Sequence, residues 1–400
     1  DFVMTLKKNC ICCNNNDLYE VLDLKEQPLA NNFVTTPTEL PKYPLKLNLC
    51  KNCYHLQLSY IVNPDILFKN YLYVSGTSRT LREYFKWFGS FVQEYTTKSC
   101  GDILEIACND GTQLDVFRDL GWNTYGVDPA ENITSTISKT HKIVCDYFNK
   151  NLFNGKRFDV IVAQNVFAHN ENAYKFLTDC MEYMKDDSFL FIQTSQSEMI
   201  QNNEFDTIYH EHISFFNIKS FFTLCKRVGI NLIDVVKSPI HGVSYIFIMS
   251  KVVSKPHLIN NLISLEKNKK LYDFNTYINY KNNVLTIRDD FVQRINQYKQ
   301  KGYIIIGYGA AAKGMTFLNF CNTKLDVIID DSSLKHNLYT PGSNIVIKDL
   351  NYIRRYSDDD IVVFVPLAWN FYTEIVNKIK SVRNNKKDMY LKYFPQLEVN

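Results

Sequence analysis

Two stretches of this 400-residue chain each predict a strand, a glycine-bearing turn and a helix, and they constrain its fold more than any other feature. The first, 103–128, opens with an apolar strand, turns at Asn109-Asp110-Gly111 and returns through a second strand that ends at Asp128. Further short apolar strands follow it along the chain. Strands that alternate with helical segments indicate a parallel sheet covered by helices. The sequence therefore predicts an α/β fold.

The loop of the first unit carries the candidate cofactor site, because ligands of such sheets bind at the carboxyl end of the strands. An acid at the tip of the second strand is placed to accept hydrogen bonds from ribose hydroxyls. The loop lacks the three-glycine dinucleotide fingerprint and suits an adenosyl ligand without a pyrophosphate, such as S-adenosylmethionine (SAM). NAD and a purely structural turn remain the alternatives. The candidate SAM-binding residues are Glu105, Ala107, Asn109, Gly111, Asp128 and, at the end of a later strand, Asn165.

The second unit, 303–331, has a Gly-x-Gly-x-x-Ala pattern directly after a strand, and Asp330 or Asp331 lies about twenty residues further on. This is a Rossmann signature that would also fit an NAD-dependent oxidoreductase. Lys313 falls in the first turn of the following helix, where with the helix amides it would hold any phosphate group. Between the two units, 257–300 is polar with apolar residues at helical spacing, which predicts a helical connection.

Eleven cysteines, an odd number, cannot all pair as disulfides. Four of them form two Cys-x-x-Cys pairs, Cys10 with Cys13 and Cys50 with Cys53. Thiolates spaced in this way can hold one Zn²⁺ along a turn, and two such pairs complete a tetrahedron. We therefore predict a closed, structural zinc site, with unligated cysteines as the alternative. Two neighbours that are close enough to be mistaken for ligands are Cys12 and His55.

Length and composition bound the remaining possibilities. A chain of this length usually divides into two or three domains, and 46% apolar residues is ordinary for a globular protein. The net charge of +3 is nearly balanced, so nucleic acid is not an expected partner, and the apolar runs are too short to span a membrane. No leader opens the sequence, which favours reduced thiols and a cytoplasmic location. We expect a monomer of three domains: a zinc module at 1–70, a SAM domain at 71–255, and at 256–400 a helical connection with a second Rossmann-like domain.

The stretch "EFDTIYHEHISFF", 204–216, places His210, Glu211 and His212 in a row. It follows a predicted strand of the central sheet on the edge where cofactors bind, and His169 ends another strand at that edge. The spacing of the two histidines suits a strand or a loop rather than a helical zinc motif. A metal site, a structural cluster and a proton-transfer site remain open. Three imidazoles on one edge favour proton transfer.

The chain resembles, almost end to end, the SAM-dependent C-methyltransferases of nucleotide-deoxysugar pathways. The motifs that carry this resemblance are "EQPLANNF", "YLYVSGTS", "EIACNDGTQL", "YHEHISFF", "IGYGAAAKG", "IDDSSLKHNLYTPG" and "LAWNFYTEI". It implies a zinc-bearing N-terminal module, a central SAM domain and a C-terminal Rossmann-like domain that helps bind the nucleotide sugar rather than NAD. The chain departs from the family at Ala107-Cys108, where members often have Gly-Ser, and at "HGVSYIF", 241–247.

The resemblance also implies roles for individual residues. The positions that match the family's active-site groups are His212 as the base, Tyr209, Glu211, His169 and Tyr73, the last preferred to Tyr71. Glu211 is expected to stay ionised beside two imidazoles and to hydrogen-bond a sugar substituent, whereas His210 is expected to be structural. The glycine loop and the resemblance together predict that Tyr308 and Lys313 contact the diphosphate of the substrate.

These assignments give a coherent reaction. A carbon next to a ketone is acidified because its carbanion delocalises as an enolate. A neutral imidazole near its ordinary pKa can remove that proton, and the SAM methyl group then alkylates the carbon. We therefore predict C-methylation of a nucleotide-linked keto-deoxysugar. The alternatives are O-methylation of such a sugar, an NAD-dependent sugar oxidoreductase and a non-catalytic zinc-bearing scaffold.

Overall fold

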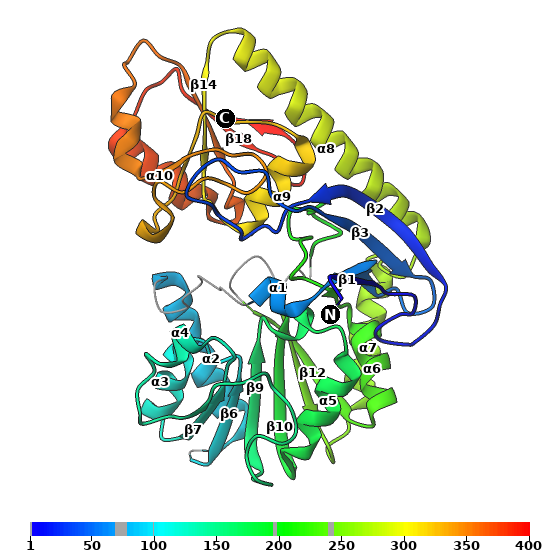
Figure 1. Cartoon of the computed structure of the whole chain (residues 1–400). Coiled ribbons are helices and arrows are strands. Elements are labelled where there is room, and N and C mark those ends of the chain that lie inside the picture. Colours follow the sequence, from blue (N-terminus) through cyan, green and yellow to red (C-terminus); the bar gives the residue numbers. More distant parts are fainter. Residues whose placement is uncertain (1, 69–77, 99, 195–197, 239–243) are drawn as a thin grey trace.

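The computed structural model of the chain describes residues 2–68, 78–98, 100–194, 198–238 and 244–400. Figure 1 shows an α/β domain at each end of the molecule, with the blue N-terminal strands beside the junction between them. Both large domains are built on sheets of mainly parallel strands, which confirms the predicted α/β class. None of the helices in the described ranges combines the length and the apolar run that crossing a membrane requires.

The N-terminal module is a small antiparallel sheet in the order β11-β4-β3-β2, beside the separate pair β1-β5. Alternation along β3 builds it, because Leu45, Leu47 and Leu49 are buried while the residues between them stay partly exposed. Its elements are β1 (Met4–Leu6), β2 (Leu18–Gln27), β3 (Tyr43–Cys50), β4 (Leu56–Leu58), β5 (Tyr60–Val62) and α1 (Pro64–Phe68).

The central domain is a sheet in the order β12-β13-β10-β9-β6-β7-β8. The strands from β10 to β8 run parallel, and β13 lies antiparallel between β10 and β12. Most residues of the middle strands are apolar and buried, as burial on both faces of a sheet requires. The elements are α2 (Arg79–Thr96), β6 (Asp102–Ile106), α3 (Thr112–Asp119), β7 (Asn123–Val127), α4 (Glu131–Thr134), β8 (Lys142–Val144), β9 (Phe158–Gln164), η2 (Phe167–His169), α5 (Ala173–Glu182), β10 (Met184–Thr194), β11 (Ser214–Phe215), α6 (Ile218–Val228), β12 (Asn231–Ser238), β13 (Ser244–Ser250) and α7 (Pro256–Asn268).

The C-terminal domain has a second sheet, in the order β16-β15-β14-β17-β18-β19, which is parallel except for β19. The predicted glycine loop joins β14 to α9, so it lies at the carboxyl edge of this sheet. The elements are α8 (Phe274–Gln300), β14 (Ile304–Tyr308), α9 (Ala312–Cys321), β15 (Val327–Ile329), η3 (Ser333–Lys335), β16 (Ile347–Lys348), η4 (Leu350–Arg355), β17 (Val362–Pro366), η5 (Trp369–Phe371), α10 (Tyr372–Val382), β18 (Met389–Lys392) and β19 (Glu398–Val399).

Two elements cross the domain boundaries expected after residues 70 and 255. Strand β11 belongs to the central part of the sequence, yet it pairs antiparallel with β4 of the N-terminal module. Helix α7 falls in the expected C-terminal part, yet it packs on the central domain. There, the Glu266 carboxylate accepts hydrogen bonds from the Ile218 amide at 2.8 Å and the Tyr245 hydroxyl at 3.1 Å. The described domains therefore interlock rather than follow one another along the chain.

One buried core joins the N-terminal module to the C-terminal domain. It contains the leucines of β2 to β4, the apolar face of α8 and the side chains between α8 and the second sheet. Along α8, residues such as Val284, Ile287, Phe291 and Ile295 recur at helical spacing on the buried side. Figure 1 shows α8 as a long diagonal helix along one side of the molecule, reaching from the C-terminal domain past β2.

Candidate active site and metal centre

The four cysteines of the two Cys-x-x-Cys pairs come together in the N-terminal module. The sulfur atoms of Cys10, Cys13, Cys50 and Cys53 all lie within 4.8 Å of one another, and two of the cross-pair distances are 3.5 Å. Each pair lies on a similar turn, closed by a hydrogen bond to the carbonyl of its first cysteine, of 2.9 Å in one pair and 2.8 Å in the other. Four thiolates at this spacing are the donor set of a closed, structural Zn²⁺ site.

The two neighbours that could be mistaken for ligands have other contacts. The ring nitrogens of His55 face the hydroxyl oxygens of Ser220 and Ser214 at 3.2 and 3.1 Å. Cys12 is fully buried, and its carbonyl accepts a hydrogen bond from Arg227 at 2.7 Å. Neither side chain belongs to the four-sulfur group found among the described residues.

The loop after β6 has a strained backbone where the cofactor is expected. Ala107, Asn109 and Gly111 have positive φ angles of 61°, 51° and 81°. Such left-handed conformations are uncommon for residues with a side chain, and they cluster at ligand-binding sites. A Cβ atom at Gly111 would lie 2.9 Å from the side chain of Ile137, so this position also requires glycine for space.

Asp128, just beyond β7, ties this loop to the neighbouring strand. One carboxylate oxygen accepts a hydrogen bond from the Asn109 amide at 3.0 Å and the other accepts one from the Ala130 amide at 2.9 Å. Each oxygen keeps a further lone pair for a ribose hydroxyl. Asn165 is exposed just beyond β9, with a φ of 56°, and reaches the same edge because β9 pairs with β6.

Glu105 belongs to a buried polar row with two glutamines that the sequence analysis missed. Gln164 ends β9, and Gln193 lies opposite it on β10. Among the described residues, Glu105 Oε1, Gln164 Oε1 and both amide atoms of Gln193 have no hydrogen-bond partner. Burial raises the pKa of Glu105 well above its usual range, helped by the negative charges of Asp110 and Asp128. Such unmet groups are uncommon in folded proteins, so this row marks a place for a polar ligand. A polar residue at the end of an apolar strand was the available sequence signal.

The predicted histidines His169 and His212 meet at the same sheet edge. The amide of Ile213 donates to the carbonyl of Ala168 at 2.8 Å. Since His212 directly precedes Ile213 and His169 directly follows Ala168, this contact brings the two imidazoles together. Their ring centroids are 5.2 Å apart, and the Tyr209 ring lies 4.0 Å from that of His212. Tyr73, with the alternative Tyr71, lies outside the described residues.

The tautomer of His212 follows from its backbone partner. Nδ1 lies 2.8 Å from the carbonyl oxygen of Thr207, and a carbonyl can only accept, so Nδ1 carries the hydrogen. In the neutral ring, Nε2 is then the basic nitrogen. Burial, with the charges of His169 and Lys313, holds the pKa of His212 well below its ordinary value. The expectation of a pKa near the ordinary value was therefore wrong, because the residue is buried, with 8% of its surface exposed.

Glu211 and His210 make contacts with residues of the N-terminal module. Glu211 accepts a hydrogen bond from Asn31 at 3.2 Å, and burial raises the pKa of its carboxyl group. This direction is opposite to the one expected from two neighbouring imidazoles, because the side chain faces the N-terminal module instead. His210 is fully buried, and its Nε2 donates to the carbonyl oxygens of Tyr43 and Pro44, both at 3.2 Å.

The two residues predicted to contact a diphosphate lie at the carboxyl edge of the second sheet. Tyr308 is 3% exposed and donates its hydroxyl to Asp331 at 2.6 Å. Lys313 is in the first turn of α9, with its ammonium 5.2 Å from the centroid of the Trp369 ring. The indole nitrogen of Trp369 donates to Asp206 in the central part of the sequence, so the lysine lies near the junction of the two domains. The tyrosine already has a carboxylate partner.

Three family models match consecutive parts of the chain. A zinc binding domain matches residues 10–68, a methyltransferase domain matches 78–235, and a C-methyltransferase C-terminal domain matches 239–393. The chain is a SAM-dependent methyltransferase. A curated relative, the C-methyltransferase NovU of Streptomyces niveus, is 24% identical over 395 residues, which cover 94% of this methyltransferase and 93% of the relative.

Solved structures are similar to part of this methyltransferase. A SAM-dependent methyltransferase of Clostridium acetobutylicum has 12% identity and a TM-score of 0.35 over 43% of this chain and 92% of its own. The 1,6-didemethyltoxoflavin-N1-methyltransferase of Burkholderia thailandensis, with bound S-adenosylhomocysteine, has 13% identity and a TM-score of 0.36 over 44% and 80%.

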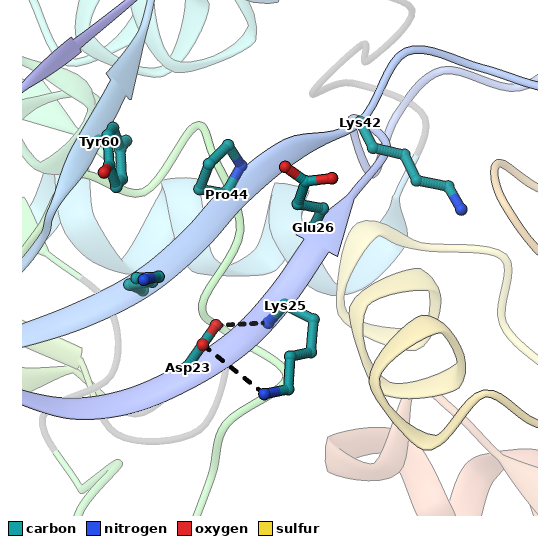
Figure 2. Close-up of a pocket in the computed structure, with 7 residues that line it drawn as sticks. Asp23, Lys25, Glu26, Lys42, Pro44 and Tyr60 are labelled. Carbon is teal, nitrogen blue, oxygen red and sulfur yellow. Dashed lines mark hydrogen bonds and ion pairs between the residues drawn. The ribbon is translucent and has the colours of Figure 1, made fainter.

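A surface pocket of this methyltransferase lies apart from these residues. Figure 2 shows it on β2 and β3 of the N-terminal module, with a volume of about 530 Å³ and lining residues Asp23, Lys25, Glu26, Lys42, Pro44, Lys46 and Tyr60. Lys25 and Asp23 pair within it at 3.7 Å, and charges of both signs surround it. Exposed pairs of this kind are weak.

Proposed function

We propose that this methyltransferase transfers the methyl group of SAM to the carbon beside the ketone of a nucleotide-linked keto-deoxysugar, and that His212 removes the proton from that carbon. The observation that carries the proposal is the hydrogen bond from His212 Nδ1 to the Thr207 carbonyl. It directs the basic nitrogen of a neutral, buried imidazole to the opposite side of the ring. The resemblance to deoxysugar C-methyltransferases supplies the substrate class.

The low pKa of His212 has a definite chemical consequence. A buried imidazole stays neutral at working pH, so every molecule carries the base in its active form. Its conjugate acid would be strong, so the transferred proton needs a nearby stabilising group. His169, stacked 5.2 Å away, and the Tyr209 ring at 4.0 Å are the described candidates for steadying the enolate and orienting the sugar. Glu211, with an unmet buried oxygen among the described residues, is a candidate for binding a sugar hydroxyl.

The SAM pocket that we propose joins the strained loop to the buried polar row. SAM, when bound, supplies an activated methyl group on sulfonium. Asp128 would accept the ribose hydroxyls, and the loop from Glu105 to Gly111, with Asn165, would surround the rest of the cofactor. The row offers acceptors on Glu105, Gln164 and Gln193 for an ammonium group and one amide donor for a carboxylate, which matches the amino-acid end of SAM. The ammonium would also favour the ionised form of Glu105.

The nucleotide part of the substrate is proposed to bind at the carboxyl edge of the C-terminal sheet. The position of Lys313 in the first turn of α9 supports this, because helix amides and a lysine together favour a phosphate group. Tyr308 could contact the diphosphate only by sharing or exchanging its Asp331 partner. The contact of Lys313 with Trp369 and the effect of its charge on His212 support a binding position near the histidines.

The test of the proposed base is hydrogen exchange in heavy water. With a dTDP-linked 4-keto-6-deoxyhexose and S-adenosylhomocysteine, the native enzyme should wash deuterium into the methyl-accepting carbon. His212→Asn should lower the rate by roughly 10²–10⁴-fold, the usual loss of a general base, with SAM affinity retained. His210→Gln is the matched control, because its ring points into the N-terminal module, and it should exchange at nearly the native rate. Undiminished exchange in His212→Asn would refute the assignment and point to His169.

The same substrate distinguishes carbon from oxygen methylation. With SAM labelled by ¹³C in the methyl group, the chemical shift of the product methyl carbon shows whether it is bonded to carbon or oxygen. An O-methyl product would mean that the base removes a proton from a hydroxyl group. Deuterium exchange at the carbon would then not be expected.

A further inference from the structure

The segment 204–208, which leads into the histidine turn, is held by the C-terminal domain although it belongs to the central part of the sequence. Phe205 is fully buried, and its ring lies 5.4 Å from those of both Phe317 and Phe394. The hydroxyl of Tyr280 on α8 donates to the carbonyl of residue 204 at 2.6 Å. The segment 204–208, which begins the loop that carries His210 and His212, is therefore part of the core of the C-terminal domain.

Asp206 makes a second polar contact of this segment with the C-terminal domain. Its carboxylate is fully buried, and Oδ2 accepts a hydrogen bond from the indole nitrogen of Trp369 at 2.8 Å. The other oxygen has no hydrogen-bond partner among the described residues. Burial raises the pKa of this carboxyl group, although the charge of Lys313, the Trp369 indole and the backbone amides of residues 206 and 207 offset part of that effect. Removing a carboxylate from water is costly even when it is partly compensated. Packing alone would favour an apolar side chain here, so the carboxylate needs another explanation.

Trp369 is itself held rigidly at the carboxyl edge of the second sheet. The amides of Leu367 and Ala368 donate to the Tyr308 carbonyl at 2.8 and 3.3 Å, which ties the end of β17 to the end of β14. Gly309 allows the close approach, because with a φ of 105° a Cβ there would lie 2.9 Å from that of Ala368. The indole also lines a pocket of about 570 Å³, together with Asn202, Asn370, Phe371 and Phe394.

One residue, Thr207, links the contact between Asp206 and Trp369 to the proposed base His212. Thr207 follows Asp206 directly, and its carbonyl is the acceptor that fixes Nδ1 of His212. The other end of the turn is closed by the hydrogen bond from the His212 amide to the Tyr209 carbonyl at 2.9 Å. Because the turn is short, a displacement of Asp206 would move the carbonyl that sets the orientation and tautomer of the imidazole.

We propose that Asp206 and Trp369 are positioning residues for His212: the indole fixes the carboxylate, and the carboxylate fixes the loop whose carbonyl orients the imidazole. The inference rests on the proposed role of His212. It makes proton removal depend on the C-terminal domain, whose edge is the proposed site of the nucleotide. A ligand in the pocket beside Trp369 would touch the same indole.

Three variants separate positioning from general stabilisation. Trp369→Phe keeps an aromatic ring beside Phe394 but removes the N–H donor. Asp206→Asn keeps an acceptor oxygen and removes the charge, so it should be the milder change. Tyr95→Phe is the matched control, because it also removes a hydrogen bond to a carboxylate, the 3.1 Å contact with Asp234 between α2 and β12. Thermal unfolding of each variant shows that it is folded.

The first readout is ¹⁵N NMR of the labelled histidine rings at pH 7, with the His212 signals identified by their loss in His212→Asn. The native ring should show hydrogen on Nδ1 and none on Nε2. In Trp369→Phe these signals should shift towards a mixture of tautomers, whereas Tyr95→Phe should leave them unchanged. Unchanged His212 signals in Trp369→Phe, or an equal shift in the control, would overturn the proposal without any use of substrate.

The second readout is deuterium exchange with the dTDP-linked 4-keto-6-deoxyhexose. Trp369→Phe should lower the exchange rate by roughly 10- to 100-fold, the scale of a hydrogen bond to a charged group, with SAM affinity unchanged. The exchange rate of Asp206→Asn should fall by less, so that it lies between the native rate and that of Trp369→Phe. Native-like exchange in Trp369→Phe would overturn the positioning role. Failure of the proposed function itself has a different mark, which is exchange that persists in His212→Asn.

Discussion

His210 should make the stability of this protein depend on acid in a way that one substitution can isolate. Burial lowers the pKa of its ring to about 4, and the carbonyls of Tyr43 and Pro44 offset only part of that effect. The unfolded chain has a histidine pKa of about 6.5. Between these values the unfolded state binds more protons than the folded state, so stability is lost as the pH falls from 6.5 through 4.

The magnitude follows from the two pKa values. Between pH 7 and pH 5, linkage gives a loss of about 2 kcal/mol in the free energy of unfolding from this ring alone. Buried carboxyl groups act in the opposite sense, among them Glu204, whose pKa burial raises to about 7. The informative quantity is therefore the difference between two proteins, in which every other group cancels.

The assay compares urea unfolding of the native protein and His210→Gln at pH 7 and pH 5. Glutamine can still donate to the two carbonyls, but it does not titrate. The variant should be less stable at pH 7, and its loss on acidification should be smaller than the native loss by about 2 kcal/mol. Equal losses in the two proteins would refute the reasoning, because they would mean that the buried ring is protonated in the folded state.

Two other predictions concern the metal and the cofactor. Cys10→Ser should leave less than one equivalent of zinc on the purified protein and should lower its thermal stability, because a structural zinc site contributes directly to folding; a full equivalent of zinc in that variant would contradict the four-thiolate site. Asp128→Ala should weaken SAM binding by ~1–3 kcal/mol in calorimetry, the scale of a lost buried partner, with Asp128→Asn as the milder control; unchanged affinity in Asp128→Ala would exclude the ribose contact.

Much of the architecture could be predicted because its signals are local. Apolar strands, turn residues and helical spacing identified both α/β domains, and two short cysteine spacings identified the metal centre. The edge of a parallel sheet then brought His169 and His212 together from distant parts of the chain. These inferences need only periodicity and the rule that strand ends share an edge.

The missed features depend on contacts between distant segments. The sequence of the strand that contains Gln193 does not show that its side-chain amide is buried without a hydrogen-bond partner among the described residues. The pairing of β11 with β4 joins residues from two expected domains, so the orientation of His210 and Glu211 towards the N-terminal module could not be inferred. The altered pKa of His212 follows from burial by several elements at once, which no local pattern reports.

The pairing of β11 with β4 also limits how such a chain can be rearranged by recombination. Strand β4 follows the second cysteine turn, and β11 begins at Ser214, two residues after the proposed base. A gene fragment that left out the N-terminal module would still encode both imidazoles, yet its histidine turn would lack the strand beside it. The N-terminal module and the loop that carries His212 therefore contact each other directly, and recombination has to keep the two together.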